Sequence, residues 1–418
     1  MNFLIKAAHI LDPSSPFHNT QQDIYVQDGI IEKIGKDLSY PNATVLNYDK
    51  LYVSQGWFDS SVSFGEPGYE ERETVEHGLK VAGLSGFTHV AYNTNTFPKP
   101  DSRADIAFLL EQATGFAVAL HPKACITTSS NEKTLAPLRE LAASGAVAFS
   151  NHKASICNAN TLKLALQYCS DFDGLVESFP FNSDLGDGGQ MHEGAVSTVM
   201  GLNGIPSIVE EIQLKRDLGL LGYTSGKLHV PTISTAQAVE LLKEAKNASM
   251  DVSTSVSIHN LFFTDETLKG FNPNAKLLPP LREDTDVEAL RAGLIDGTID
   301  MVTSDHQPLN SELKDVELDR AEFGSLGLEH TFGVLLKIFP IEDVVSFLTR
   351  GKTRFGIPSK TIEAGAQADI TLFTPKGTTT VTKDSLLSTS KNSLYIGEVL
   401  PGNVYGVLAQ GKALLQEV

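Results

Sequence analysis

The chain has 418 residues, 41% of them hydrophobic and 20% charged, so it exceeds a single small module and has room for one large and one smaller domain. Its 33 Lys and Arg against 51 Asp and Glu give a formal net charge of -18, which disfavours nucleic acid and anionic membranes as partners. Cys125, Cys157 and Cys169 form no C-x-x-C pair, so we expect a reducing, cytoplasmic location without disulfides. We expect neither a signal peptide nor a membrane span, because no apolar stretch approaches 18 residues.

Both ends of the chain are predicted to form β structure. Near the N-terminus, Asp28-Gly29 separates two apolar-rich runs, 23–26 and 30–34, which predicts a hairpin. Near the C-terminus, residues 368–373 and 404–409 are similar runs separated by turns that contain Gly and Pro. Two β-rich ends therefore flank a middle of different character.

The middle, from about residue 52 to about residue 350, alternates apolar strand-like runs with helical stretches, which indicates parallel βαβ units. Residues 234–237, Ser-Thr-Ala-Gln, form a capping box ahead of apolar residues at helical spacing, so a helix should begin there. This alternation of strands and capped helices is typical of a (β/α)8 barrel, in which the active site lies on the loops that follow the strands. The strand candidates in this middle are 86–92, 145–149, 227–230 and 299–303.

Several motifs span nearly the whole chain in one order. They are Gly56-Trp-Phe-Asp59, Glu66-Pro-Gly-Tyr-Glu70, Asn93-Thr-Asn95, Pro279-Pro-Leu-Arg282, Asp296-Gly-Thr-Ile-Asp300, Ser304-Asp305-His306 and Gly324-Ser-Leu-Gly-Leu-Glu329. With these motifs the chain resembles dihydroorotase, an amidohydrolase, of the type found in multifunctional complexes. The resemblance implies an α/β fold: a (β/α)8 TIM barrel over residues 52–354 and a small β-sandwich domain made from residues 1–51 and 355–418.

The resemblance also implies a metal site. The family hydrolyses a cyclic amide with hydroxide that two divalent metals generate from bound water. Such a site needs a His-x-His pair after strand one, a carboxylate or carboxylated lysine after strand four, histidines after strands five and six, and an Asp after strand eight.

Most of these ligand positions hold the wrong residue type. Only Asp305 matches, so zinc could not obtain the three or four protein ligands that it uses. Near the strand-four position, Lys153 keeps the option of carboxylation. The other positions are occupied by Ser61, Ser63, Asn151, Ser178 and Thr232.

The positions that would contact substrate have also changed. Gly65 stands where an arginine should clamp the substrate carboxylate, a contact that would be strong and bidentate. Leu278 and Leu309 replace an expected asparagine and histidine, and Asn95 is the substrate-contact position that still matches. His259 is a further candidate for substrate binding.

Two alternatives concern the residues that remain. Asp305 is either a catalytic remnant or, as we favour, a structural carboxylate that accepts backbone N–H groups, since it lacks evident partners. His152, His229, His259 and His306 are either hydrogen-bonded fillers, as is usual for lone histidines, or parts of a rebuilt single-metal site.

The sequence therefore predicts a metal-deficient, non-catalytic dihydroorotase-like protein of pyrimidine biosynthesis. The resemblance implies a structural role as a partner of aspartate transcarbamoylase, and we expect a homo-oligomer without a cofactor. One alternative is an active dihydroorotase or other cyclic-amide hydrolase that uses Asp305, His259 and His152 with zinc. Another is a sensor that binds a ligand in the barrel mouth without chemistry.

Overall fold

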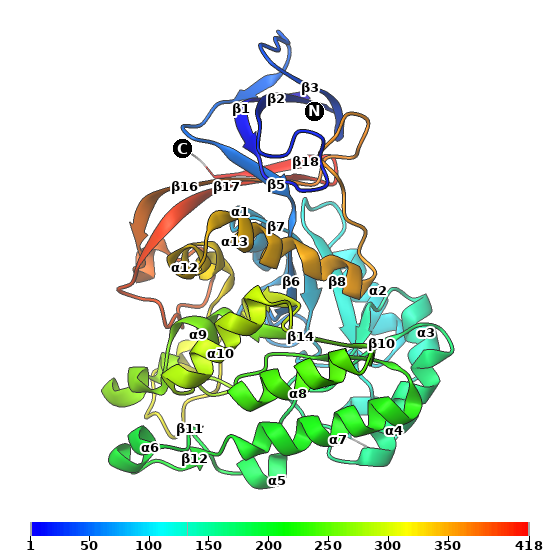
Figure 1. The fold of residues 1–418 in the computed structure, drawn as a ribbon, viewed down its shortest axis with the longest axis vertical. Helices are drawn as coiled ribbons and strands as arrows, with labels where there is room; N and C mark the ends of the chain where they lie inside the picture. The colour runs from blue at the N-terminus through cyan, green and yellow to red at the C-terminus, as the bar shows by residue number, and fades with distance from the viewer. Residues whose placement is uncertain (1, 132, 417–418) are drawn as a thin grey trace.

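The structure is a computed structural model that describes residues 2–131 and 133–416. Figure 1 shows two parts, a barrel surrounded by helices and, above it, a curved sheet in which both chain ends lie. Among the described residues, no helix combines the length and apolar character needed to cross a bilayer.

The barrel is built from eight strands in the described residues, and every neighbouring pair is parallel. The ring closes between the first and last strands, where Val62 bridges His306 and the Ser63 N–H donates to the His306 carbonyl at 2.9 Å. The predicted fold class is thereby confirmed. In ring order the strands are β6 (Trp57–Val62), β7 (Phe87–Tyr92), β8 (Ala119–Ala124), β9 (Ala148–Phe149), β10 (Leu175–Glu177), β13 (Lys227–Val230), β14 (Val252–Ser257) and β15 (Met301–Thr303).

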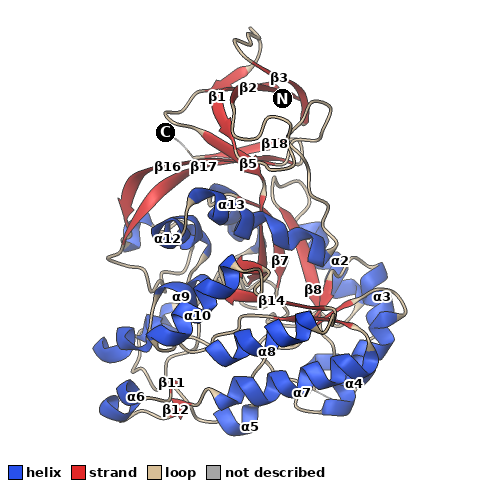
Figure 2. Cartoon of the chain, viewed as in Figure 1, coloured by secondary structure: helices blue, strands red, loops and turns tan. Residues whose placement is uncertain are grey.

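Helices follow the strands and cover the outside of the barrel (Figure 2). The main ones are α1 (Val75–Leu84), α2 (Arg103–Gln112), α3 (Leu138–Ala143), α4 (Ala159–Ser170), α7 (Ile208–Thr224), α8 (Ala236–Asn247), α10 (Asp284–Ile295), α12 (Thr331–Ile338) and α13 (Ile341–Thr349). Shorter elements are α5 (Ser183–Gly186), β11 (Met191–His192), α6 (Ala195–Met200), β12 (Gly204–Ile205), α9 (Ile258–Phe262), α11 (Ser311–Lys314), and the 3-10 turns η1 (Thr128–Ser130), η2 (Asp265–Gly270), η3 (Pro273–Ala275), η4 (Leu328–His330), η5 (Arg350–Phe355) and η6 (Lys383–Ser385).

The helix predicted after β13 exists, but its cap differs from the predicted box. Thr235 is the N-cap of α8, and its hydroxyl accepts from the Ala238 N–H at 3.2 Å. Ser234 instead donates its hydroxyl to Glu210 of α7, which also accepts the backbone N–H groups of Ser234 and Thr235 at 2.9 Å each. A buried carboxylate from the neighbouring helix therefore accepts the Ser234 N–H, which the predicted box would have paired with Gln237.

The second part is one continuous sheet from both chain ends. The hairpin at Asp28-Gly29 is confirmed, and both residues adopt positive φ, 49° and 83°, as a type I′ turn requires. Residues 52–55, expected in the barrel segment, pair with β1 and β16 and lie in this sheet. The strands are β1 (Asn2–Ile10), β2 (Gln21–Gln27), β3 (Ile30–Gly35), β4 (Thr44–Leu46), β5 (Tyr52–Gln55), β16 (Ile370–Thr380), β17 (Val399–Ala409) and β18 (Lys412–Leu415).

An aromatic cluster joins the two parts. Trp57, at the start of β6, is fully buried, and its ring lies 5.0 Å from that of Phe332 in α12 and 5.3 Å from that of Phe373 in β16. Its indole N–H donates to the Ser54 hydroxyl at 3.0 Å, so the ring buries its apolar area without leaving a donor unpaired. The first barrel strand is thereby fixed against the sheet.

Asp59 holds the first and last strands of the barrel together. Its buried carboxylate accepts the backbone N–H of Ser61 at 3.0 Å and that of Ser304 at 2.9 Å, and it also accepts the hydroxyl of Thr303. Burial raises the pKa of Asp59, and these donors lower it only in part. The Asp59 carboxylate therefore links β6 to the end of β15, the two strands between which the barrel closes.

We predict that Asp59→Ala lowers the free energy of unfolding by about 3 kcal/mol or more, because it leaves buried donors unpaired on both strands. Chemical denaturation measures the loss. The exposed Asp187, changed to Ala, is the matched control and should shift stability by less than about 0.5 kcal/mol. Equal stability of the two variants would contradict the role of Asp59 in closing the barrel.

Candidate functional site at the barrel mouth

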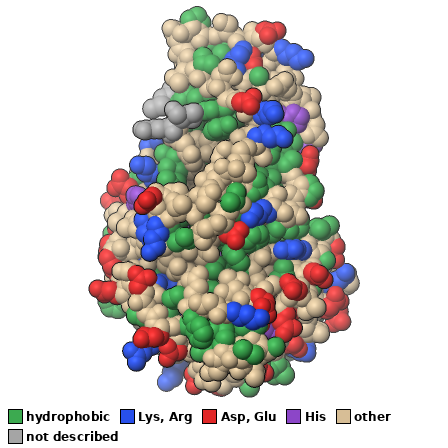
Figure 3. Space-filling view, turned by 90° about the vertical axis from the view of Figure 1, so that its left-hand side faces the viewer, with side chains coloured by type: hydrophobic (Ala, Val, Ile, Leu, Met, Phe, Trp, Pro, Cys, Tyr) green, Lys and Arg blue, Asp and Glu red, His purple; other side chains and the backbone are tan. Residues whose placement is uncertain are grey.

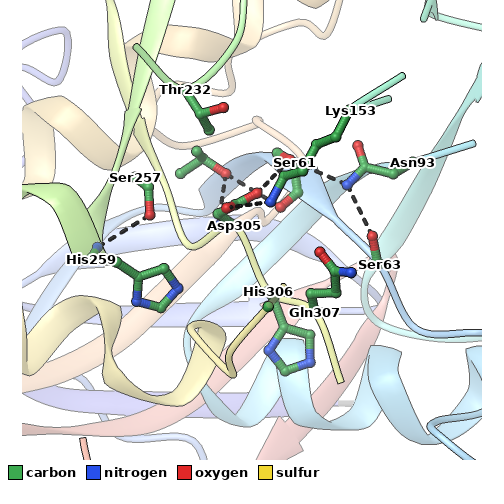
Figure 4. Close-up of polar contacts among 12 residues, drawn as sticks. Ser61, Ser63, Asn93, Lys153, Thr232, Ser257, His259, Asp305, His306 and Gln307 are labelled. Carbon is green, nitrogen blue, oxygen red and sulfur yellow. Dashed lines mark hydrogen bonds and ion pairs between the residues drawn. The ribbon is translucent and has the colours of Figure 1, made fainter. Parts of the chain in front are cut away.

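The positions that resemble metal ligands all lie at the carboxyl ends of barrel strands, as expected. Ser61 and Ser63 lie at the end of β6, and Asp305 follows β15. Figure 4 shows Ser61, Asp305 and Lys153 converging near the centre of the mouth. The structure therefore brings Ser61 and Asp305 together at the mouth and places the ammonium of Lys153 against Asp305.

An ion pair spans the mouth of the barrel. The Lys153 ammonium lies 2.8 Å from one carboxylate oxygen of Asp305, and the two side chains are only 13% and 5% exposed. Lys153 follows β9, which lies four strands from β15 in the eight-stranded ring and is therefore on the opposite side. Ser61 donates a longer hydrogen bond, 3.4 Å, to the other oxygen.

Asp305 was expected to be a structural carboxylate without side-chain partners, accepting backbone N–H groups. That expectation is wrong in its detail, because its partners are the side chains of Lys153 and Ser61. Burial raises the pKa of Asp305, and the charge and hydrogen bond of Lys153 offset only part of the rise. A carboxylated Lys153 would instead bring a second negative charge against this buried carboxylate.

The two serines belong to a hydrogen-bonded chain across β6 and β7. The Asn93 amide donates to Ser61 at 3.2 Å and to Ser63 at 3.1 Å, and the Ser63 hydroxyl donates to the Asn95 side-chain oxygen at 2.9 Å. The Asn93 oxygen accepts from Lys123 at 3.2 Å. The serines are therefore paired with neighbouring side chains, and Asn95, the predicted substrate contact, is held by Ser63.

A second buried ion pair lies beside this chain, and sequence reasoning missed it. The Lys123 ammonium, at the end of β8, lies 2.9 Å from a Glu177 oxygen at the end of β10, and both residues are almost fully buried. The feature that could have pointed to this pair is that each residue lies at the carboxyl end of a barrel strand. Since both are long side chains on different strands, their meeting could not be inferred from spacing.

The remaining predicted ligand positions serve local structure. The Asn151 side-chain oxygen accepts the Ile126 N–H at 3.0 Å, and its amide donates to Thr127. Ser178 donates to Asp217 on α7 at 2.6 Å. Thr232 has a positive φ of 49°, and its N–H donates to the Ser255 hydroxyl at 3.2 Å.

Three histidines of the barrel, His229, His259 and His306, are buried, and burial lowers the pKa of each. Burial and nearby Lys and Arg hold the pKa of His229 well below its usual range, and His229 lies between Ser253 and Ser255. His259, a predicted substrate contact, is hydrogen-bonded to the Tyr395 hydroxyl at 3.0 Å. His306 accepts the Gly327 N–H at 3.2 Å, and burial lowers its pKa to about 3.

These side chains do not fit a metal. Among the described residues, His152, His259 and Asp305 do not form a cluster of three ligand atoms within 4.8 Å, whereas His192, Asp265 and Glu283, on the segments after β10 and β14, do. The Arg282 guanidinium is 2.9 Å from Nδ1 of His192 and donates to it, which leaves the proton on Nε2, the nitrogen that faces Glu283. The groups around Asp305 are an ammonium, hydroxyls and amides, which are not the histidine and carboxylate ligands that two divalent metals require.

Gly65, at the position of the expected arginine clamp, lies in a tight turn. Its φ is 149°, and a Cβ atom added here would be 2.3 Å from the Tyr69 carbonyl oxygen. The turn is closed by the Tyr69 N–H, which donates to the Gly65 carbonyl at 3.1 Å. No side chain fits at residue 65 unless this loop moves. Of the other two changed positions, Leu278 lines a cavity at the mouth and Leu309 is buried.

Comparisons with solved structures define the class of the fold. The chain superposes with a TM-score of 0.85 on an L-hydantoinase (dihydropyrimidinase) from Arthrobacter aurescens, with 21% identity, covering 98% of this chain and 95% of the other. A dihydropyrimidinase from Brevibacillus agri gives 0.82, with 20% identity and coverage of 100% and 95%. This chain therefore shares the overall fold of these two proteins.

Comparisons of sequence define the family. A family model described as Dihydro-orotase-like matches residues 50–238. The dihydroorotase of Pelotomaculum thermopropionicum is 36% identical over 424 residues, covering 100% of this chain and 99% of its own. That of Acetivibrio thermocellus is 36% identical over 423 residues, covering 99% of each. This chain belongs to the dihydroorotase family.

We predict that Lys153→Met destabilises the fold by about 3 to 5 kcal/mol, because it leaves the Asp305 carboxylate buried without a counter-charge. Without Lys153 the pKa of Asp305 rises further in the folded state. The folded state then binds more protons than the unfolded chain, so the stability of the variant should fall as pH rises from about 4 to about 7.

The matched control is the double variant Lys153→Met with Asp305→Asn, which removes both charges. Chemical denaturation of the four proteins across this pH range gives the coupling energy between the two sites. The double variant should recover most of the stability and lose the added pH dependence. Additive effects would contradict the ion pair.

Proposed function

We propose that this chain is a catalytically inactive member of the dihydroorotase family that serves pyrimidine biosynthesis as a structural partner of aspartate transcarbamoylase. The observation that carries the inactivity is the ion pair of Lys153 with Asp305. It gives the one retained metal-ligand carboxylate a permanent protein cation in place of a divalent ion.

The chemistry of the ammonium supports this proposal. Hydrolysis of an unactivated amide requires a strong nucleophile at neutral pH, and a divalent metal supplies one by lowering the pKa of a water that it coordinates. An ammonium can neutralise Asp305, but it has no vacant coordination position for a water oxygen. The hydroxyls of Ser61 and Ser63 are hydrogen-bonded to Asp305, Asn93 and Asn95, and within the described residues none of these partners is a histidine that could act as a base.

The surface supports a role in assembly. Val199 on α6 is 82% exposed, Phe271 at the end of η2 is 54% exposed, and α6 and η2 are in contact. Figure 3 shows apolar side chains among charged ones on this side of the molecule. Large apolar side chains exposed on adjacent elements are typical of protein–protein contact sites. We call Val199 and Phe271 the α6 surface.

The first test is of metal and activity. Purified with added zinc, the protein should hold far less than one metal per chain by elemental analysis and should neither form nor hydrolyse dihydroorotate. Stoichiometric metal together with turnover would overturn the proposal of inactivity and favour a rebuilt hydrolase.

A rescue series makes the same test sharper. With Lys153 retained, restoring the family's ligands should fail to give stoichiometric zinc, because the ammonium repels it. Adding Lys153→Gly to the same variant should let zinc bind, and metal should return before activity, since surrounding groups must orient each ligand. The restored ligands are Ser61→His, Ser63→His, Asn151→Asp, Ser178→His and Thr232→His.

The second test is of the partner. Aspartate transcarbamoylase from the same organism should co-elute with this protein in size-exclusion chromatography. Charged substitutions on the α6 surface, Val199→Asp with Phe271→Asp, should weaken the complex about tenfold or more. The matched control is Val45→Asp, because Val45 is 55% exposed on β4 of the terminal sheet. No complex, and no effect on transcarbamoylase activity, would remove the partnership.

A further inference from the structure

A group of carboxylates lies next to the α6 surface. Asp265 is the first residue of η2, the turn that contacts α6, and Glu283 directly precedes α10. With His192, three residues before α6, they place three polar side-chain atoms within 4.8 Å of one another. Because α6 and η2 have six residues each, they are only about 9 and 12 Å long, so Val199 and Phe271 belong to the same region of the surface.

Asp265 is a buried carboxylate without a counter-charge. The residue is 3% exposed, and it forms no ion pair within residues 2–131 and 133–416. Burial raises the pKa of Asp265, and the charges of Glu283 and Glu266 raise it further, while the Glu266 N–H and Lys269 offset only part of the rise. Lys269 is itself paired with Glu266. The acidic cluster, as we call Asp265, Glu266 and Glu283, therefore carries more negative charge than the chain around it neutralises.

The other basic groups beside the acidic cluster do not supply the missing charge. Arg282 donates to Nδ1 of His192 at 2.9 Å and to the Ile205 carbonyl at 3.0 Å, and its counter-charge is Glu210 at 4.0 Å. Burial and the charge of Arg282 lower the pKa of His192 to about 4, so this ring is neutral at pH 7. Its Nε2 carries a proton and is no metal ligand. The acidic cluster thus calls for a cation from outside the chain.

The exposed apolar side chains beside the cluster indicate what kind of cation this is. A free ion would gain nothing from Val199 and Phe271, which are 82% and 54% exposed, whereas a protein surface would bury both. Arginine is enriched where apolar and charged contacts meet in protein interfaces. Its planar guanidinium donates several hydrogen bonds in fixed directions and is less strongly hydrated than the lysine ammonium, so it suits two carboxylates that lie close together.

We propose that the α6 surface and the acidic cluster form one docking site, whose partner presents an arginine side chain beside an apolar patch. The guanidinium lies between the carboxylates of Asp265 and Glu283, and the partner's apolar side chains cover Val199 and Phe271. This inference rests on the proposed function, in which the partner is aspartate transcarbamoylase, and it adds the chemistry that the docking surface of the transcarbamoylase must present.

Neutral variants of the full chain test the proposal by isothermal titration calorimetry with the transcarbamoylase. Asp265→Asn with Glu283→Gln keeps the shape of both side chains and should weaken the complex about tenfold or more, because the arginine loses its counter-charges. Raising the salt from about 50 mM to about 500 mM should weaken the unaltered complex and affect the double variant much less. Without the partner, the double variant should be at least as stable as the unaltered chain at pH 7, because the amides remove the repulsion, whereas a structural role of the carboxylates would make it less stable.

The matched control is Glu363→Gln, which removes one exposed carboxylate from the loop before β16, while α6 lies at the end of the molecule opposite the terminal sheet (Figure 1). It should bind as the unaltered protein does. A complex that forms equally well with the double variant, at both salt concentrations, would overturn this inference and leave the partnership standing. Failure of the unaltered chain to form any complex would overturn both.

Discussion

The ion pair between Lys153 and Asp305 is the interaction on which the character of this barrel depends. It joins residues that follow β9 and β15, two strands on opposite sides of the ring, and so links the two sides across the mouth. A buried ion pair adds little net stability, since desolvation of both charges cancels most of their attraction, but the loss of one partner is costly. Once such a lysine is present, Asp305 has to be kept for the fold.

The neighbouring polar groups also form hydrogen bonds and ion pairs with one another. Ser61, Ser63 and Asn93 share hydrogen bonds, and Lys123 pairs with Glu177 beneath them. A site for divalent ions gathers like charges that repel one another until the metal arrives. This interior instead balances cation against anion within the chain, which suits a barrel that is folded and closed without any ligand.

Much of the fold could be predicted from sequence, because it depends on local patterns. The Asp28-Gly29 hairpin follows from turn chemistry, and the strands at 86–92 and 227–230 follow from apolar runs. The serines at 61 and 63 could be placed at the mouth because they follow a strand within a recognisable motif. The residue types at these positions could therefore be known from the sequence alone.

The partners of those residues could not be predicted, because they come from strands distant in sequence. Lys153 was read only as a residue that carboxylation might modify, since nothing in the order of residues says that its side chain crosses the barrel. Ser234 was expected to cap α8, yet its hydroxyl is bound to Glu210 on another helix, and Thr235 is the N-cap. Long side chains and contacts between helices determine these hydrogen-bond and ion-pair partners, and the spacing of residues along the chain predicts neither.

The turn at Gly65 bears on the history of the chain. Because the Tyr69 carbonyl occupies the space of any Cβ at residue 65, an arginine cannot return by a single substitution while the loop keeps its present path. The loop would have to relax first, and that intermediate would bring no gain in catalysis for selection to act upon. Gaining an arginine at residue 65 therefore takes at least two changes in order, first one that moves the loop and then one that supplies the side chain, and the first has no benefit until the second has occurred.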